Sequence, residues 1–228
     1  MPTDTSIFRP VFRTLRGYAL DPSLAQELRT APISEMMFRI PWEDLEPGPI
    51  GKYLEVIDYD PPAKCFYEPV DLNDRYLLAQ DGLAPSEGTP QFHQQMVYAV
   101  AQLTISNFER ALGRTTLWAP RRSDDASHSK DDSGFVERLR IYPHALREAN
   151  AYYSPQKIAL LLGYFSASTG DPGDHMPGAM VFTALSHDII AHETAHALLD
   201  GMYRELNRPT NPDMLAFHEG FADVVALF

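Results

Sequence analysis

The chain has 228 residues, and its 44% hydrophobic and 11% aromatic content is that of a folded protein and not of a disordered one. A net charge of −12 argues against binding to nucleic acid or to an anionic membrane, because both need a basic surface. The single cysteine, Cys65, excludes a framework of intrachain disulfides.

The N-terminal residues 1–23 alternate apolar residues with arginine, proline and polar residues, and they lack the continuous apolar stretch of a secretory signal. The longest apolar run, Ile158–Phe165, has the length of a strand and is too short to span a membrane. We therefore expect a soluble, cytoplasmic protein. Export without disulfides, or by a route that uses no standard signal, is the alternative.

The first 90 residues are rich in proline and in short apolar runs. They predict a brief helix from Pro22 to about Arg29, capped by Asp21 or Ser23. Residues 52–59 combine aromatic and β-branched side chains and predict a strand, which the two following prolines end. We find no chemistry in this part of the chain.

A long helix is predicted over Gln91–Leu112, with Gly113 at its C-cap. Its apolar residues recur every three to five positions, and they are Phe92, Met96, Val100, Leu103 and Phe108. Such a stripe can line a ligand pocket, but core packing is far more common. We therefore assign it to the core.

Residues 121–134 form a polar loop of mixed charge. His128 in this loop has no partners at metal-ligand spacing, so we interpret the segment as a solvated loop and not as a metal site. Strands are predicted at 135–142 and 156–165, and the second is apolar enough to be covered on both faces. A loop rich in glycine, aspartate and proline follows at 166–177.

Two helices complete the chain. Ser186 is a good N-cap for a helix that reaches about Glu205. Asn211 as cap and Pro212 at the first helical position predict a second helix that extends at least to Ala226. Mixed strands followed by helices favour an α+β domain over a doubly wound α/β fold.

The first of these helices carries His192-Glu-Thr-Ala-His196, an H-E-x-x-H pattern. Residues four apart lie on one helix face, so both imidazoles can bind one zinc ion. Glu193 is placed beside the open coordination position, where it can take a proton from a zinc-bound water. A polar helix face is the alternative, but the flanking residues are apolar or small, namely Ile189, Ile190, Ala191, Ala197, Leu198 and Leu199.

The second helix carries a matching pair, Glu219 and Asp223, again four residues apart. If the two helices pack antiparallel, Glu219 reaches the metal and completes a His–His–Glu set with one open position, which is a catalytic and not a structural ligand set. Asp223 can then accept the second ring N–H of a zinc-bound histidine. The apolar neighbours of Glu219 predict that this helix is buried; they are Phe217, Phe221, Val224, Val225 and Leu227.

These two motifs together resemble the thermolysin-like, or gluzincin, zinc metallopeptidases. Asn150-Ala-Tyr-Tyr153 is similar to the Asn-Ala-aromatic segment of that family, and the predicted helix at 91–112 also fits. The resemblance covers about residues 91–228. It implies a thermolysin-like N-terminal catalytic half, a twisted mixed sheet with zinc-site helices, in which residues 1–90 are a strand-rich segment of the same module.

By resemblance, the metal ligands are His192, His196 and Glu219, with one Zn²⁺ per chain. Glu193 is then the general base in the hydrolysis of peptide bonds, and Asp223 orients His192.

The resemblance also implies that Asn150, Ala151 and Tyr152 bind an extended peptide or protein substrate along an edge strand. Asp188 matches a calcium-binding position of secreted members, but we interpret it as a charge that favours the helix N-terminus. His218 replaces an asparagine that is usual in the family.

The family continues into a helical C-terminal domain that supplies an oxyanion-stabilising histidine, and no counterpart is expected in this sequence. Tyr203 is a weak substitute, since its offset from the zinc helix differs from that of the family tyrosine. We expect a missing domain or a partner chain to cover the last helix. A non-catalytic zinc-bound scaffold or regulatory domain, a truncated inactive fragment, and a zinc hydrolase acting on other substrates are the alternatives. Substrate preference, oligomeric state and an inhibitory role of residues 1–90 stay open.

Overall fold

A computed structural model of the chain describes residues 10–19, 21–23, 33–121, 134–171, 175–203 and 211–227. Most of the predicted helix at 22–29, and the loop that contains His128, lie outside the described residues. The elements are β1 (Phe12–Tyr18), β2 (Glu35–Pro41), β3 (Leu54–Val56), β4 (Tyr59–Asp60), β5 (Cys65–Phe66), α1 (Arg75–Ala79), α2 (Pro90–Leu112), β6 (Leu139–Leu146), β7 (Ala151–Ser154), β8 (Ala159–Ser166), β9 (Met180–Phe182), a 3-10 turn η3 (Thr183–Leu185), α3 (His187–Met202) and α4 (Pro212–Ala226).

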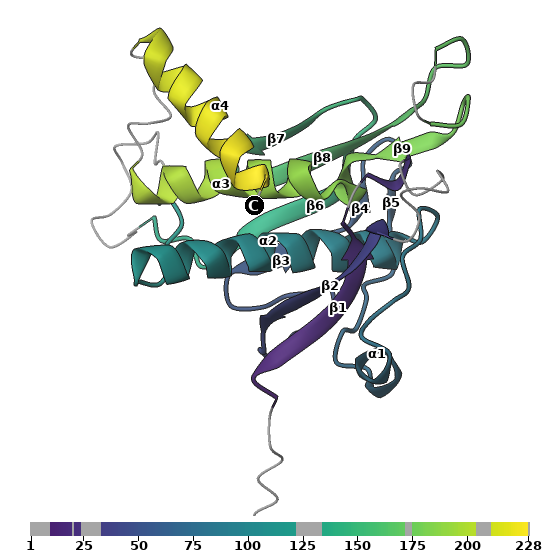
Figure 1. The fold of residues 1–228 in the computed structure, drawn as a ribbon, viewed down its shortest axis with the longest axis horizontal. Helices are drawn as coiled ribbons and strands as arrows, with labels where there is room; N and C mark the ends of the chain where they lie inside the picture. Colours follow the sequence, from purple (N-terminus) through teal and green to yellow (C-terminus); the bar gives the residue numbers. More distant parts are fainter. Residues whose placement is uncertain are drawn as a thin grey trace, which may run out of the picture.

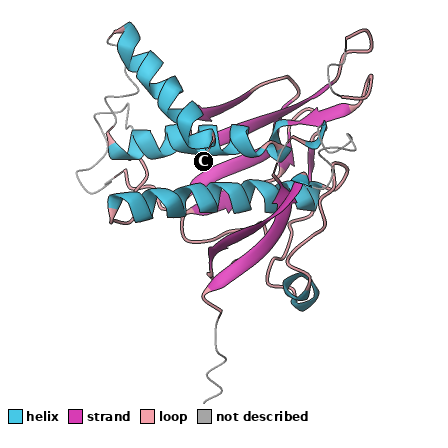
Figure 2. Cartoon of the chain, viewed as in Figure 1, coloured by secondary structure: helices cyan, strands magenta, loops and turns pink. Residues whose placement is uncertain are grey.

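The main sheet is mixed, which confirms the predicted α+β class. Its strand order is β3-β6-β8-β7, with β3, β6 and β8 parallel and β7 antiparallel at the edge. β9 pairs antiparallel with the end of β8, and β1–β2 and β4–β5 form separate antiparallel pairs. Helices α2 and α3 lie side by side on one face of this sheet, and α4 projects from the region of α3 (Figures 1 and 2).

The long helix α2 confirms the prediction for residues 91–112, both in extent and in role. Pro90 occupies its first turn, and Gly113 ends it in the left-handed conformation, with φ of 66°. Phe92, Met96 and Val100 are completely or almost completely buried and belong to the main hydrophobic core. The apolar stripe along the N-terminal and central part of α2 is therefore core.

The predicted strands need correction. Residues 52–59 do not form one strand: β3 pairs with β6, and the chain then turns so that β4 pairs with β5. The interruption falls at Ile57 and Asp58, between β3 and β4, and the side chain of Asp58 is buried. The strand predicted at 135–142 begins four residues later, as β6, and Phe135 is exposed. β8 likewise begins three residues late, because Ile158 adopts a turn conformation with φ of 50°.

Helices α3 and α4 form where the capping residues predict them. Asn211 caps α4 by accepting a hydrogen bond from the backbone N–H of Met214. Ser186 occupies the N-cap position of α3, but its hydroxyl donates to Asp188 instead of capping the backbone.

Within the described residues, no helix has the length and apolarity that a membrane crossing requires.

The prediction that α4 is buried is wrong for most of its surface. His218 and Ala222 are its buried residues, whereas Phe217 and Val224 are about half exposed. The reason is geometric: α4 contacts α3 along one face, and its apolar residues extend around the helix beyond that face.

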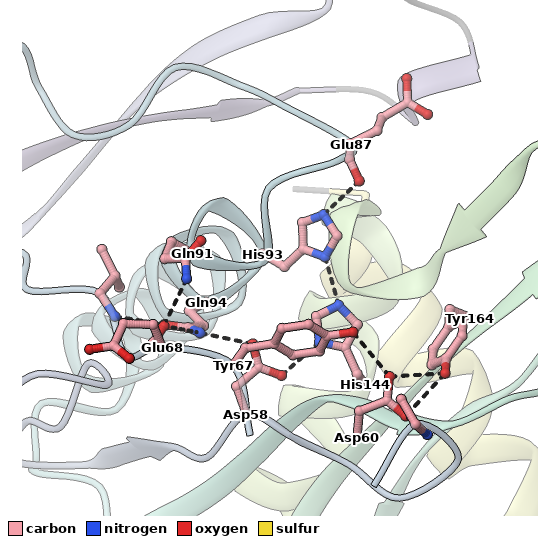
Figure 3. A network of polar contacts seen from close by, with 12 residues as sticks. Asp58, Asp60, Tyr67, Glu68, Glu87, Gln91, His93, Gln94, His144 and Tyr164 are labelled. Carbon is pink, nitrogen blue, oxygen red and sulfur yellow. Dashed lines mark hydrogen bonds and ion pairs between the residues drawn. The ribbon is translucent and has the colours of Figure 1, made fainter. Parts of the chain in front are cut away.

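A buried polar network joins α2 and β6 to Asp58, which lies between β3 and β4 (Figure 3). Nδ1 of His144 lies 2.6 Å from the carboxylate of Asp58, and its Nε2 lies 2.8 Å from Nδ1 of His93. The other ring nitrogen of His93 lies 3.0 Å from the backbone oxygen of Glu87, to which it donates. The three side chains are at most 6% exposed, so this chain of hydrogen bonds is shielded from water.

Candidate metal centre

The two histidines of the H-E-x-x-H pattern point the same ring atoms at one position. His192 and His196 lie one turn apart on α3, and their Nε2 atoms are 2.9 Å apart. His196 is buried and His192 is partly buried. Burial is the main reason that the pKa of His196 falls to about 4, so the ring is neutral near pH 7, as a metal ligand must be.

Helix α4 brings a carboxylate to the same position. Oε2 of Glu219 lies 3.3 Å from Nε2 of His192 and 3.6 Å from Nε2 of His196. A tetrahedral zinc with bonds of about 2.0–2.1 Å separates its ligand atoms by about 3.3 Å. The three separations, 2.9, 3.3 and 3.6 Å, lie on both sides of this value, and these three residues are the group that could hold a metal ion among the described residues.

The remaining ring nitrogens of both histidines have partners on α4. Nδ1 of His192 lies 3.0 Å from Asp223, as the sequence predicts. Nδ1 of His196 lies 2.5 Å from Nδ1 of His218, and the two rings are nearly parallel. Such partners fix the tautomer that leaves Nε2 free for the metal.

Glu193 lies beside the three donor atoms and not among them. Glu193 is 8% exposed, and its carboxylate accepts a hydrogen bond of 2.7 Å from the backbone N–H of Tyr153 in β7. Burial raises the pKa of Glu193 to about 7, against the opposing effects of this N–H and of His192. A carboxylate with a pKa near the working pH suits a general base.

One residue of this region, Asp200, and one contact, that of His218 with His196, were not predicted from the sequence. Asp200 is 2% exposed and accepts a hydrogen bond of 2.7 Å from the hydroxyl of Tyr153. Its position held a signal, because Asp200 follows His196 by four residues on the same helix face. His218 stands out in the sequence beside Glu219, but its contact with His196 could not be predicted, because it depends on how α3 and α4 pack.

Two cavities flank the metal centre, and the predicted substrate residues line them. A cavity of about 490 Å³ lies against Asn150 and Ala151, and one of about 310 Å³ lies against Ala151 and Tyr152. Glu193 and His192 line both cavities. Tyr203 lies at the C-cap of α3, is 60% exposed and lines neither cavity, so the structure does not bring it to this centre.

Asp188 lies in the first turn of α3, where its carboxylate accepts hydrogen bonds from the Ser186 hydroxyl and from the backbone N–H of Ile189. These bonds agree with its interpretation as a helix N-terminal charge.

No family model matches the chain, and no curated protein matches its sequence at a significant level.

Proposed function

We propose that this chain is the catalytic part of a zinc metallopeptidase of the thermolysin-like, or gluzincin, type. The observation that carries the proposal is the convergence of three donor atoms, from His192, His196 and Glu219, at mutual distances of 2.9 to 3.6 Å. The α+β architecture of the described residues, with its mixed sheet, is compatible with such a fold. Zinc bound there would act as a Lewis acid that polarises the peptide carbonyl and acidifies water.

Glu193 supports hydrolysis in preference to a structural role for the metal. Its carboxylate borders both cavities at the metal centre, where it can accept the proton of the attacking water. A structural zinc site has four protein ligands, whereas three are present here among the described residues.

Strand β7 supports a peptide as the substrate. It forms the free edge of the main sheet and directs the N–H of Tyr153 toward Glu193, away from β8. Backbone groups two residues apart on a strand point the same way, so Ala151 also presents its N–H and C=O outward. An extended peptide can therefore add to this edge as a further strand, with its backbone beside the metal centre.

The test compares wild type with Glu193→Gln in zinc content and in hydrolysis of quenched peptides. We expect one zinc per chain in both proteins and hydrolysis only by wild type. His218 and Asp223 stay in place in the variant, so the metal site is unchanged. Equal residual hydrolysis by the two proteins would reject the peptidase proposal, and zinc binding with no hydrolysis by wild type would favour the scaffold alternative.

A further inference from the structure

A third cavity, of about 550 Å³, lies on the face of the main sheet that is turned away from α2 and α3. Alternation along the strands defines this face: Arg140 and Tyr142 of β6 and Leu161 of β8 line the cavity, whereas Ile141 and Leu160 between them belong to the main core. None of the lining residues belongs to a helix. A cavity of this size holds a ligand or a short peptide segment.

The charged residues that line this cavity are all cations. They are Arg121, Arg140 and Lys157, and no aspartate or glutamate is among the lining residues. This is the reverse of the whole chain, whose net charge is −12. Glu55 lies near Arg140, but at 3.8 Å and with both side chains about one-third exposed, so this ion pair is weak.

The cavity also presents tyrosines beside its cations. Tyr59 and Tyr142 line it together with the amide of Gln156, and Leu161 and Ala145 contribute apolar surface. Neither Arg121 nor Lys157 has an ion pair with another described residue. The described surface therefore offers cations, hydroxyls and an amide to a ligand that carries several carboxylates along an extended backbone.

Tyr152 connects this cavity to the metal centre. It is 38% exposed and lines both the cationic cavity and the 310 Å³ cavity that contains His192, Glu193 and Glu219. The two cavities thus lie on opposite sides of the edge strand β7, and Pro155 borders the second of them where β7 ends.

We propose that the cationic cavity is an exosite that binds an acidic segment of the polypeptide substrate, N-terminal to the bond that is cleaved. The inference rests on the proposed peptidase function. A peptide that pairs antiparallel with β7 has its N-terminal part at the Ser154 end of the strand, next to Pro155. From there a few residues suffice to pass the β7–β8 turn at Gln156 and Lys157 and to enter the cationic cavity.

The experiment measures binding of fluorescent peptides to the zinc-loaded Glu193→Gln full chain by anisotropy. Three peptides share one central sequence: the first has four acidic residues at its N-terminal end, the second has four glutamines there, and the third has the acidic residues at its C-terminal end. We expect the first to bind roughly three- to tenfold more tightly than the other two at low ionic strength, and less so in salt.

Variants assign the effect to the cavity. Arg140→Gln combined with Lys157→Gln should remove the advantage of the acidic peptide, and Lys157→Glu should shift the preference toward a lysine-extended peptide. Arg75→Gln, which changes an exposed cation on α1, is the matched control and should leave the preference intact. All three cations are at least partly exposed, so these variants should fold, and circular dichroism checks this.

The outcomes separate the two proposals. Preferential binding of the acidic peptide without hydrolysis by wild type would support the exosite and reject the peptidase. If wild type hydrolyses the peptides and all three bind Glu193→Gln with equal affinity, the peptidase proposal stands and the exosite is overturned. Displacement of the acidic peptide by millimolar inorganic phosphate, at matched ionic strength, would overturn it in favour of a site for small anions.

Discussion

The carboxylate of Glu193 on α3 accepts a hydrogen bond of 2.7 Å from the backbone N–H of Tyr153 on β7. This bond joins the helix that carries the two histidines to the free edge of the sheet. The hydroxyl of the same tyrosine bonds to Asp200, two turns farther along α3. One residue of the edge strand thus contacts Glu193 and the helix that carries it, so the edge of the sheet lies beside the candidate metal centre.

Removal of one histidine ligand should abolish metal binding. Atomic absorption should find far less than one zinc per chain in His196→Ala, because the two remaining donors cannot form the site. In wild type, zinc at 100 times its dissociation constant should stabilise the fold by about 2.7 kcal/mol and raise Tm by roughly 5–10 °C. A chelator should reverse that shift in wild type and have no effect on the variant. A variant that keeps one zinc per chain would disprove the ligand assignment.

His218 should matter for metal affinity through its contact with His196. His218→Ala removes the partner of the second ring nitrogen, and loss of such a partner typically weakens metal affinity 10- to 100-fold. His218→Asn, with an amide that can also accept a hydrogen bond, should retain most of the affinity. Competition with a fluorescent zinc chelator measures both variants. Equal affinities for wild type and His218→Ala would show that the contact does not hold the ligand.

Gly163 in β8 should be essential for the position of β7. A Cβ at this residue would lie 2.3 Å from the backbone oxygen of Glu148 and 2.4 Å from that of Asn150. Gly163→Ala should therefore displace the chain that leads into β7, at a cost of roughly 1–3 kcal/mol in unfolding free energy. The expected functional result is a higher KM with zinc content unchanged.

Gly88→Ala is the control for this substitution, because nothing lies within 4 Å of a Cβ at that position. Urea denaturation should give it the wild-type stability. If Gly163→Ala were as stable as Gly88→Ala, the close backbone approach at Gly163 would not constrain β7.

The buried network around His93 should make the protein sensitive to acid. Burial and the neighbouring His144 lower the pKa of His93 from its ordinary 6.5 to about 3. Between these two values the unfolded chain binds a proton that the folded chain does not, so stability falls as the pH drops below about 6.5. The contribution of one such group approaches about 1.4 kcal/mol per pH unit.

His93→Gln should lower stability at pH 7, because the hydrogen bond to His144 is lost, but it should also flatten the dependence on pH between 6.5 and 4. Urea denaturation at several pH values measures the two slopes. Parallel curves for wild type and His93→Gln would show that His93 takes up no proton on unfolding.

Local signals in the sequence predicted the positions of the long helices well. The apolar period of α2 and its terminal glycine, and the Asn211-Pro212 start of α4, predict helices whose bounds the structure reproduces within a few residues. The strands were less predictable, because pairing with distant segments sets their ends. Asp58 illustrates this: its local pattern continues a strand, whereas in the structure it lies between β3 and β4 and contacts the distant His144.

By itself, the sequence determined that His192 and His196 share a helix face, since that follows from a spacing of four residues. It also marked Glu219 and Asp223 as a second pair on another helix. Only the tertiary structure decided that these pairs meet within 3.6 Å, that His218 contacts His196, and that β7 lies between the metal centre and a cationic cavity. Helical periodicity is a property of neighbouring residues, whereas these relationships depend on packing between segments that are distant in the chain.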